Sequence, residues 1–235
     1  NIVGGFEVAG ISVIDGSNIT GNYKGVWLTG TKTIKLSSDG NLIRTAATQT
    51  FIIDGPTLEG KENNNDSLVY VENGSTVELL KGAISGNTTT HAGGVYVLSG
   101  GTFNMSGGTI SGNTSTSDGG GLCVHGTFNM SGGIISDNKA TSSGGGVRLL
   151  TGNFNMSGGT FSKNDAGTSG GGVNVNNGTF TMTGGIIYGK NDENGNENTA
   201  KTGEGAAFRK FGGTATLNSN PLNTMYDDTI PENPA

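Results

Sequence analysis

One motif recurs along the middle of this chain at an almost constant spacing. Its first full copy reads TFNMSGGTISGN, and the four copies occupy Thr102–Asn113, Thr127–Asn138, Asn153–Asn164 and Thr179–Asn191. The methionines of successive copies are about 25–26 residues apart. A fixed period of about 20–50 residues is the signature of an architecture built from stacked repeats. The period therefore predicts one continuous array rather than several globular domains.

Apolar and polar residues alternate within each copy, which predicts short strands. In the first copy, Phe103 and Met105 are expected to point inward from one strand and Ile110 from a second. Gly107-Gly108 predicts a corner between them, and Leu122–Val124 predicts a third strand. Three short strands and three turns in about 26 residues describe one rung of a parallel β-helix.

Stacking places equivalent residues of successive rungs above one another, about 4.8 Å apart. One inward ladder is predicted to contain Phe51, Val77, Phe103, Phe128, Phe154 and Phe180. A second is predicted to contain Ile14, Leu36, Ile53, Leu79, Met105, Met130, Met156, Met182 and Leu217. An amide ladder with hydrogen bonds along the axis is predicted at Asn87, Asn113, Asn138 and Asn164. These ladders predict an all-β parallel β-helix (β-solenoid) of about nine rungs.

The pattern also divides the chain. Residues 11–217 are expected to form the β-helix, with an N-terminal cap or added strand at 1–10 and a C-terminal cap or linker at 218–235. The latter segment holds three of the four prolines. The polar stretch 190–204 is predicted to be an insertion loop. Because the sequence starts without a methionine or a signal peptide, we expect a mature or excised fragment.

Composition excludes several classes of function. The formal net charge of −6 and the lack of a basic patch argue against nucleic acid as a partner. No apolar run has transmembrane length, so we expect no membrane insertion of this segment. The single cysteine, Cys123, excludes an internal disulfide framework. His91 and His125 fall at different repeat positions, and no paired carboxylates, catalytic triad or metal-ligand cluster is visible, so we expect no enzyme activity, metal or cofactor.

A candidate ligand-binding strip comes from matching Gly25–Leu28 to Gly94–Val97. This match places Trp27, Tyr70 and Tyr96 on the outward side of the third strand, with Cys123, Arg148 and Asn174 following in the same column. Three aromatic side chains followed by the Arg148 guanidinium could stack on and hold sugars, so Trp27, Tyr70, Tyr96 and Arg148 are the candidate site residues. The alternatives are aromatic residues merely scattered over the surface and a contact with a missing neighbouring domain.

A second outward face is flatter and consists of two columns of small polar residues. The first column contains Thr76, Thr102, Thr127, Asn153, Thr179 and Thr214. The second contains Glu78, Asn104, Asn129, Asn155, Thr181 and Thr216. Regular Thr/Asn arrays resemble ice-binding β-solenoids, although small polar residues also suit any solvated sheet.

The repeats resemble a known group of proteins. FSKNDAGTSGGGV at Phe161–Val173 and ISGNTSTSDGGGL at Ile110–Leu122 resemble the FxxN…GGA repeats of polymorphic outer-membrane proteins. The whole unit is similar to tandem repeats of bacterial adhesin-like surface proteins, over about Gly10–Leu217. Ile replaces the Phe in most copies, and Gly replaces the Ala of GGA. The resemblance implies a right-handed parallel β-helix that is secreted or surface-anchored, and it implies no catalytic site.

Together these observations predict a non-enzymatic extracellular surface protein, an adhesin-like stalk or a structural subunit. The alternative is a pectate-lyase-like β-helix that binds or degrades polysaccharides, and ice binding is a third reading. The expected partners are host or matrix glycans or proteins. Open strand edges at the terminal rungs template further pairing, so they must be covered or used for self-association. For residues 1–10, folding over the chain's own first rung is favoured over addition as a strand to a neighbouring molecule.

Overall fold

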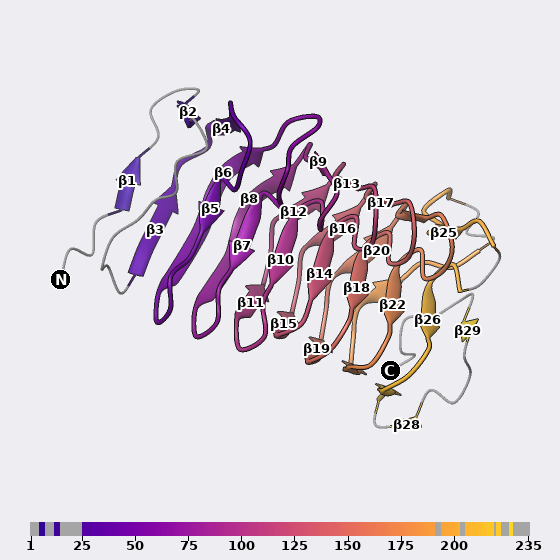
Figure 1. The fold of residues 1–235 in the computed structure, drawn as a ribbon. Helices are drawn as coiled ribbons and strands as arrows, with labels where there is room; N and C mark the ends of the chain where they lie inside the picture. The colour runs from indigo at the N-terminus through magenta and orange to yellow at the C-terminus, as the bar shows by residue number, and fades with distance from the viewer. Residues whose placement is uncertain are drawn as a thin grey trace.

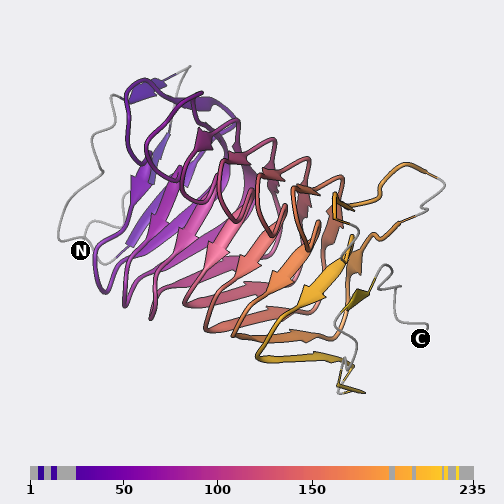
Figure 2. The same ribbon diagram turned by 45° about the vertical axis from the view of Figure 1, so that its right-hand side comes forward.

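The computed structural model describes residues 5–7, 12–14, 25–190, 194–202, 205–218, 220–221 and 226–227. Within them the chain forms strands and no helix, and it winds into stacked parallel rungs (Figures 1 and 2). β1 lies at one end of the resulting rod and β29 at the other (Figure 1). The predicted fold class, an all-β parallel β-solenoid, is confirmed.

Each rung has three faces, which we number in chain order. The first face comprises β1 (Gly5–Glu7), β3 (Gly25–Thr29), β6 (Thr50–Glu59), β8 (Thr76–Ser85), β11 (Thr102–Met105), β15 (Thr127–Met130), β19 (Asn153–Met156), β23 (Thr179–Met182) and β27 (Thr214–Leu217). The second comprises β2 (Ser12–Ile14), β4 (Thr33–Leu36), the second halves of β6 and β8, β12 (Thr109–Ser111), β16 (Ile134–Ser136), β20 (Thr160–Ser162) and β24 (Ile186–Ile187).

The third face comprises β5 (Ile43–Arg44), β7 (Val69–Val71), β10 (Val95–Val97), β14 (Leu122–Val124), β18 (Val147–Leu149), β22 (Val173–Val175) and β26 (Phe208–Lys210). Between the second and third faces, a sheet of two-residue strands lies where the sequence predicts only loops. It contains β9 (Thr88–Thr89), β13 (Thr114–Ser115), β17 (Lys139–Ala140), β21 (Asp165–Ala166) and β25 (Thr199–Ala200).

The inward ladders form the core, as the alternation predicts. Phe103, Phe128, Phe154 and Phe180 are fully buried and in register. The rings of Phe128 and Phe154 stack with centroids 4.6 Å apart. The methionine ladder from Ile53 through Met182 is likewise buried, so the predicted inward faces of the central rungs are confirmed.

The predicted asparagine ladder is confirmed and is longer than expected. The backbone N–H and side-chain Nδ2 of Asn138 both donate to Asn164 Oδ1, at 3.2 and 3.0 Å, and Asn113 donates to Asn138 in the same way. Asn64 and Asn198 extend the ladder at its two ends. All of these side chains are buried, so the amides supply hydrogen bonds where the backbone turns a corner.

At the N-terminal end, the predicted register is wrong. β3 pairs with β6 on the first face, where Trp27 lies opposite Ile52 and Leu28 opposite Ile53. Leu28 therefore occupies the ladder position that the sequence assigned to Leu36, whereas Leu36 lies on the second face and pairs with Ile14. Short strands on every face have the same alternation of apolar and polar residues, so this pattern does not show which face a given strand occupies.

The rod has about six turns, slightly fewer than the nine rungs predicted. Among the described residues, nine strands stack on the first face, but those that follow β2 and β27 add no parallel strand to the third face. The insertion within 190–204 is also narrower than predicted. Asn198 continues the asparagine ladder and β25 pairs with β21, so the additional residues of this rung precede Asn198.

The two ends are built differently. β1 continues the first face in parallel, with Gly5 opposite Trp27. At the other end, β28 (Asn220–Pro221) pairs antiparallel with β27, and β29 (Tyr226–Asp227) pairs antiparallel with β26. A proline in a strand cannot donate to a further neighbour, so Pro221 suits an end strand. The remainder of the predicted segments 1–10 and 218–235 lies outside the described residues.

Truncation in the aromatic ladder tests the core. Phe128→Ala should lower the free energy of unfolding by roughly 3–5 kcal/mol, because it removes a fully buried ring that contacts two neighbouring rings. Thr127→Ala, on the outward side of the same strand, is the control. Equal midpoints for the two variants in urea titrations would contradict the assignment of faces.

The asparagine ladder makes a second prediction about stability. Asn138→Ala removes the acceptor for the backbone N–H of Asn113 and the donor to Ile110 O, both buried. Leaving such groups unpaired should cost about 2–4 kcal/mol. Asn129→Ala, in the solvent-exposed amide column, should cost less than about 1 kcal/mol. Urea melts of the two variants measure the difference, and a smaller loss for Asn138→Ala would contradict this role.

Candidate functional site

The third face carries an outward column that contains three of the four predicted site residues. From Arg44 the register runs through Tyr70, Tyr96, Cys123 and Arg148 to Asn174 and Arg209. Trp27 is not in this column, because it lies on the first face in β3. The expected strip of Trp27, Tyr70, Tyr96 and Arg148 is therefore not a single surface.

The two tyrosines form a closed stack. Their ring centroids are 5.1 Å apart at 13°, the Arg44 guanidinium lies 4.5 Å from the centre of Tyr70, and the His125 ring lies 5.6 Å from Tyr96. Each ring thus has a neighbour on both sides along the axis, and the stack presents ring edges to solvent. Because sugars stack on open aromatic faces, this geometry suits a structural ladder better than a sugar platform.

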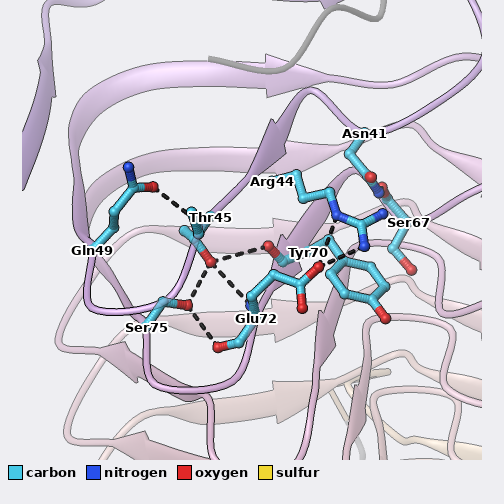
Figure 3. A network of polar contacts seen from close by, with 9 residues as sticks. Asn41, Arg44, Thr45, Gln49, Ser67, Tyr70, Glu72 and Ser75 are labelled. Carbon is cyan, nitrogen blue, oxygen red and sulfur yellow. Dashed lines mark hydrogen bonds and ion pairs between the residues drawn. The ribbon is translucent and has the colours of Figure 1, made fainter. Parts of the chain in front are cut away.

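Polar contacts hold the N-terminal side of this stack in place (Figure 3). Arg44 binds the carboxylate of Glu72, with Nη2 and Oε1 2.5 Å apart. The hydroxyl of Thr45 accepts a hydrogen bond from the backbone N–H of Glu72 at 3.0 Å and lies 2.5 Å from Ser75 Oγ. These contacts fix Arg44 over Tyr70. Its guanidinium group therefore already interacts with Glu72 and with the Tyr70 ring.

The other half of the column is covered by glycine-rich loops. Cys123 is 4% exposed and Asn174 is fully buried, although both point outward. Gly170 has a positive φ of 65°, and a Cβ there would lie 2.6 Å from Asn174 Cβ. Only glycine allows this close approach. Arg148, with a side chain 11% exposed, lies 3.9 Å from Asp118 and also donates to Asn174.

Burial favours the neutral forms of Cys123 and Tyr96 in this column and of the adjacent His125. It raises the pKa of Cys123 to about 12, with a smaller contribution in the same direction from Asp118 and an opposing one from Arg148. Burial, together with Cys123, Tyr70 and Asp66, raises the pKa of Tyr96 to about 12. Burial also lowers the pKa of His125. At neutral pH this column therefore offers neither a thiolate nor an imidazolium.

The thiol of Cys123 provides a pH prediction. A pKa of about 12 against an ordinary value of 9.0 leaves about a thousandfold less thiolate at pH 8, so iodoacetamide should react at least that much more slowly than with the urea-unfolded chain. The pKa of the Cys123 thiol is higher in the folded chain than in the unfolded chain. The neutral thiol therefore contributes stability that is fully present below pH 9.0 and is lost as the pH rises towards 12. Similar labelling rates for folded and unfolded protein would contradict this burial.

An open groove lies at the corner between the first and second faces. Its volume is about 380 Å³. One wall is the column Asn104, Asn129, Asn155 and Thr181; the other is the column Ser106, Ser131, Ser157 and Thr183. Met105, Met130 and Met156 also line it. The alternation of the sequence predicts the first column but not the groove. The recurring Met-Ser-Gly-Gly corner is the sequence feature that could have indicated a groove here.

An amide ladder orders the asparagine wall. Asn129 Nδ2 donates to Asn104 Oδ1, and Asn155 Nδ2 donates to Asn129 Oδ1, both at 2.9 Å. The outward column continues through Glu78 and Ile52 to Trp27, which is 42% exposed. The structure thus brings Trp27 into line with the groove rather than with the tyrosines.

Comparisons with protein-family models, with curated proteins and with solved structures found no match to this chain. Among the described residues, no group of three or more His, Cys, Asp or Glu side chains could hold a metal ion. The same part of the chain contains no helix long and apolar enough to span a membrane. The geometry of the groove and of the tyrosine column therefore carries the functional argument.

Proposed function

We propose that this chain is a non-enzymatic extracellular surface protein, an adhesin-like stalk or structural subunit that presents a repetitive β-helix surface. The observation that carries the proposal is the in-register repetition of similar side chains along the rod, both in the core and on the first face. Such repetition presents one polar surface many times on a rigid support.

Rigidity supports a stalk or scaffold. Buried hydrogen bonds join the asparagines of consecutive rungs from Asn64 to Asn198, and a continuous apolar core runs beside them. The nine strands described on the first face, stacked at a spacing of roughly 4.8 Å, correspond to a rod on the order of 40 Å long. A bend would have to break several of these ladders at once.

The state of the acidic side chains supports a non-enzymatic role. Five of them form ion pairs with Lys or Arg: Glu59 with Lys35, Glu72 with Arg44, Asp39 with Lys61, Asp54 with Lys81 and Asp118 with Arg148. Each pair links residues 22 or more positions apart and thus bridges rungs. Polysaccharide hydrolysis needs two free carboxyl groups facing one bond, which suits these paired acids poorly.

The resemblance of the GGGV-containing units to bacterial outer-membrane and adhesin-like repeats supports a secreted or cell-surface location in a bacterium. A polysaccharide-binding β-helix is the second candidate, and the groove along Asn104, Asn129 and Asn155 favours it. Ice binding by the outward threonine column is the third. The adjoining groove makes this region less flat than an ice-binding surface requires.

Labelling of intact cells tests the proposed function. In cells that produce the full-length protein, an antibody raised against residues 25–190 should label the surface without permeabilisation. Purified protein should release neither reducing ends nor unsaturated sugars from a panel of polysaccharides. Labelling that requires permeabilisation, or product release that a matched heat-denatured control lacks, would overturn the proposal.

A further inference from the structure

The groove follows the solenoid axis and repeats an amide and a hydroxyl at three rungs, with two hydroxyls at the fourth. Its two walls span four rungs, from Asn104 to Thr181. At roughly 4.8 Å per rung, the groups recur over about 14 Å. A linear polymer with a similar repeat would meet equivalent polar groups at each rung. Sugar units of an extended polysaccharide have that length, whereas an extended peptide rises about 3.3 Å per residue.

Much of the hydrogen-bonding capacity of the walls is not used within the described residues. Each amide donor in the asparagine wall uses one N–H on its neighbour, which leaves the second N–H for a ligand. The hydroxyls of Ser106, Ser131 and Ser157 are exposed and make no hydrogen bond within that part of the chain. Amides and hydroxyls offer both donors and acceptors, as a row of sugar hydroxyls requires.

Trp27 adds an aromatic surface in line with the groove. It lies three rungs before Asn104 in the same column, with Ile52 on one side and Gly5 on the other. Trp27 is 42% exposed, one of the few large apolar residues on the described surface with this much exposure. An aromatic face that remains open can stack on the apolar face of a sugar ring. The stacked tyrosines of the third face lack this property.

Charge selects among polysaccharides. Glu78 lies between Trp27 and Asn104 in the column, and the groove-lining residues include no Lys or Arg. The chain as a whole has a formal net charge of −6. An acidic polysaccharide would therefore be repelled along this path, whereas a neutral one would not.

We propose that the groove and the column that extends it to Trp27 bind a single neutral polysaccharide chain parallel to the solenoid axis. This inference rests on the proposed function, because it names the ligand class of the presented surface. The serine and asparagine walls hold the sugar hydroxyls over four rungs. Trp27 stacks on a sugar unit farther along a longer chain.

Calorimetric titration with neutral β-1,4-linked oligosaccharides of glucose, xylose and mannose tests the assignment, with chains of about four and about eight units. Ser131→Val/Ser157→Val should weaken binding of both lengths by about tenfold, since it removes two hydroxyls from the groove. Trp27→Ala should weaken binding of the longer chain by about tenfold and leave the shorter unchanged, because only the longer chain reaches it.

Ser111→Val/Ser136→Val is the matched control. It makes the same substitutions on the second face, outside the groove, and should bind like the native chain. Absence of binding to every neutral oligosaccharide, equal losses for both double variants, or tighter binding of polygalacturonate would each overturn the inference. These outcomes are distinct from failure of the proposed function, which cell-surface labelling decides separately.

Discussion

In-register hydrogen bonding between rungs is the constraint on which the rest of this structure depends. Parallel strands pair through the backbone on each face, and the asparagine ladder does the same at a corner, where Asn113 and Asn138 each donate to the next amide oxygen. Each rung must place its strands in register with those of the rungs beside it. Residues beyond the usual repeat length can therefore only form a loop outside the stack, as they do before Asn198. The constancy of the repeat length follows from this requirement.

Stacking also determines what the surface can offer. On the third face, stacking places Tyr70 against Tyr96 and covers Cys123 and Asn174 with loops, so little of that face remains open. At the corner between the first and second faces, small side chains at Ser106 and Ser131 leave a groove instead. The same repeat thus produces one closed and one open surface, depending on side-chain size and on the path of the adjoining loop.

The proposed polysaccharide would be bound by repetition rather than through one strong contact. The groove has no cluster of charges. Three of its rungs contribute an amide and a hydroxyl and the fourth contributes two hydroxyls, and each such group would add little free energy to binding. Affinity then grows with the number of rungs that a linear ligand covers. A rigid rod suits this mode, because the ladders hold the groups at fixed spacing before the ligand arrives.

The sequence alone determined the fold class, the inward ladders of Phe103 and Met105, and the asparagine ladder, because a 26-residue period with alternating polarity admits few other packings. Only the tertiary structure decided which face a short strand occupies. Trp27 has the same local pattern on either face, and its pairing with Ile52 rather than with the tyrosine column depends on contacts distant in sequence. Burial of Arg148 and the open groove likewise depend on how loops and corners pack, which a period of two cannot specify.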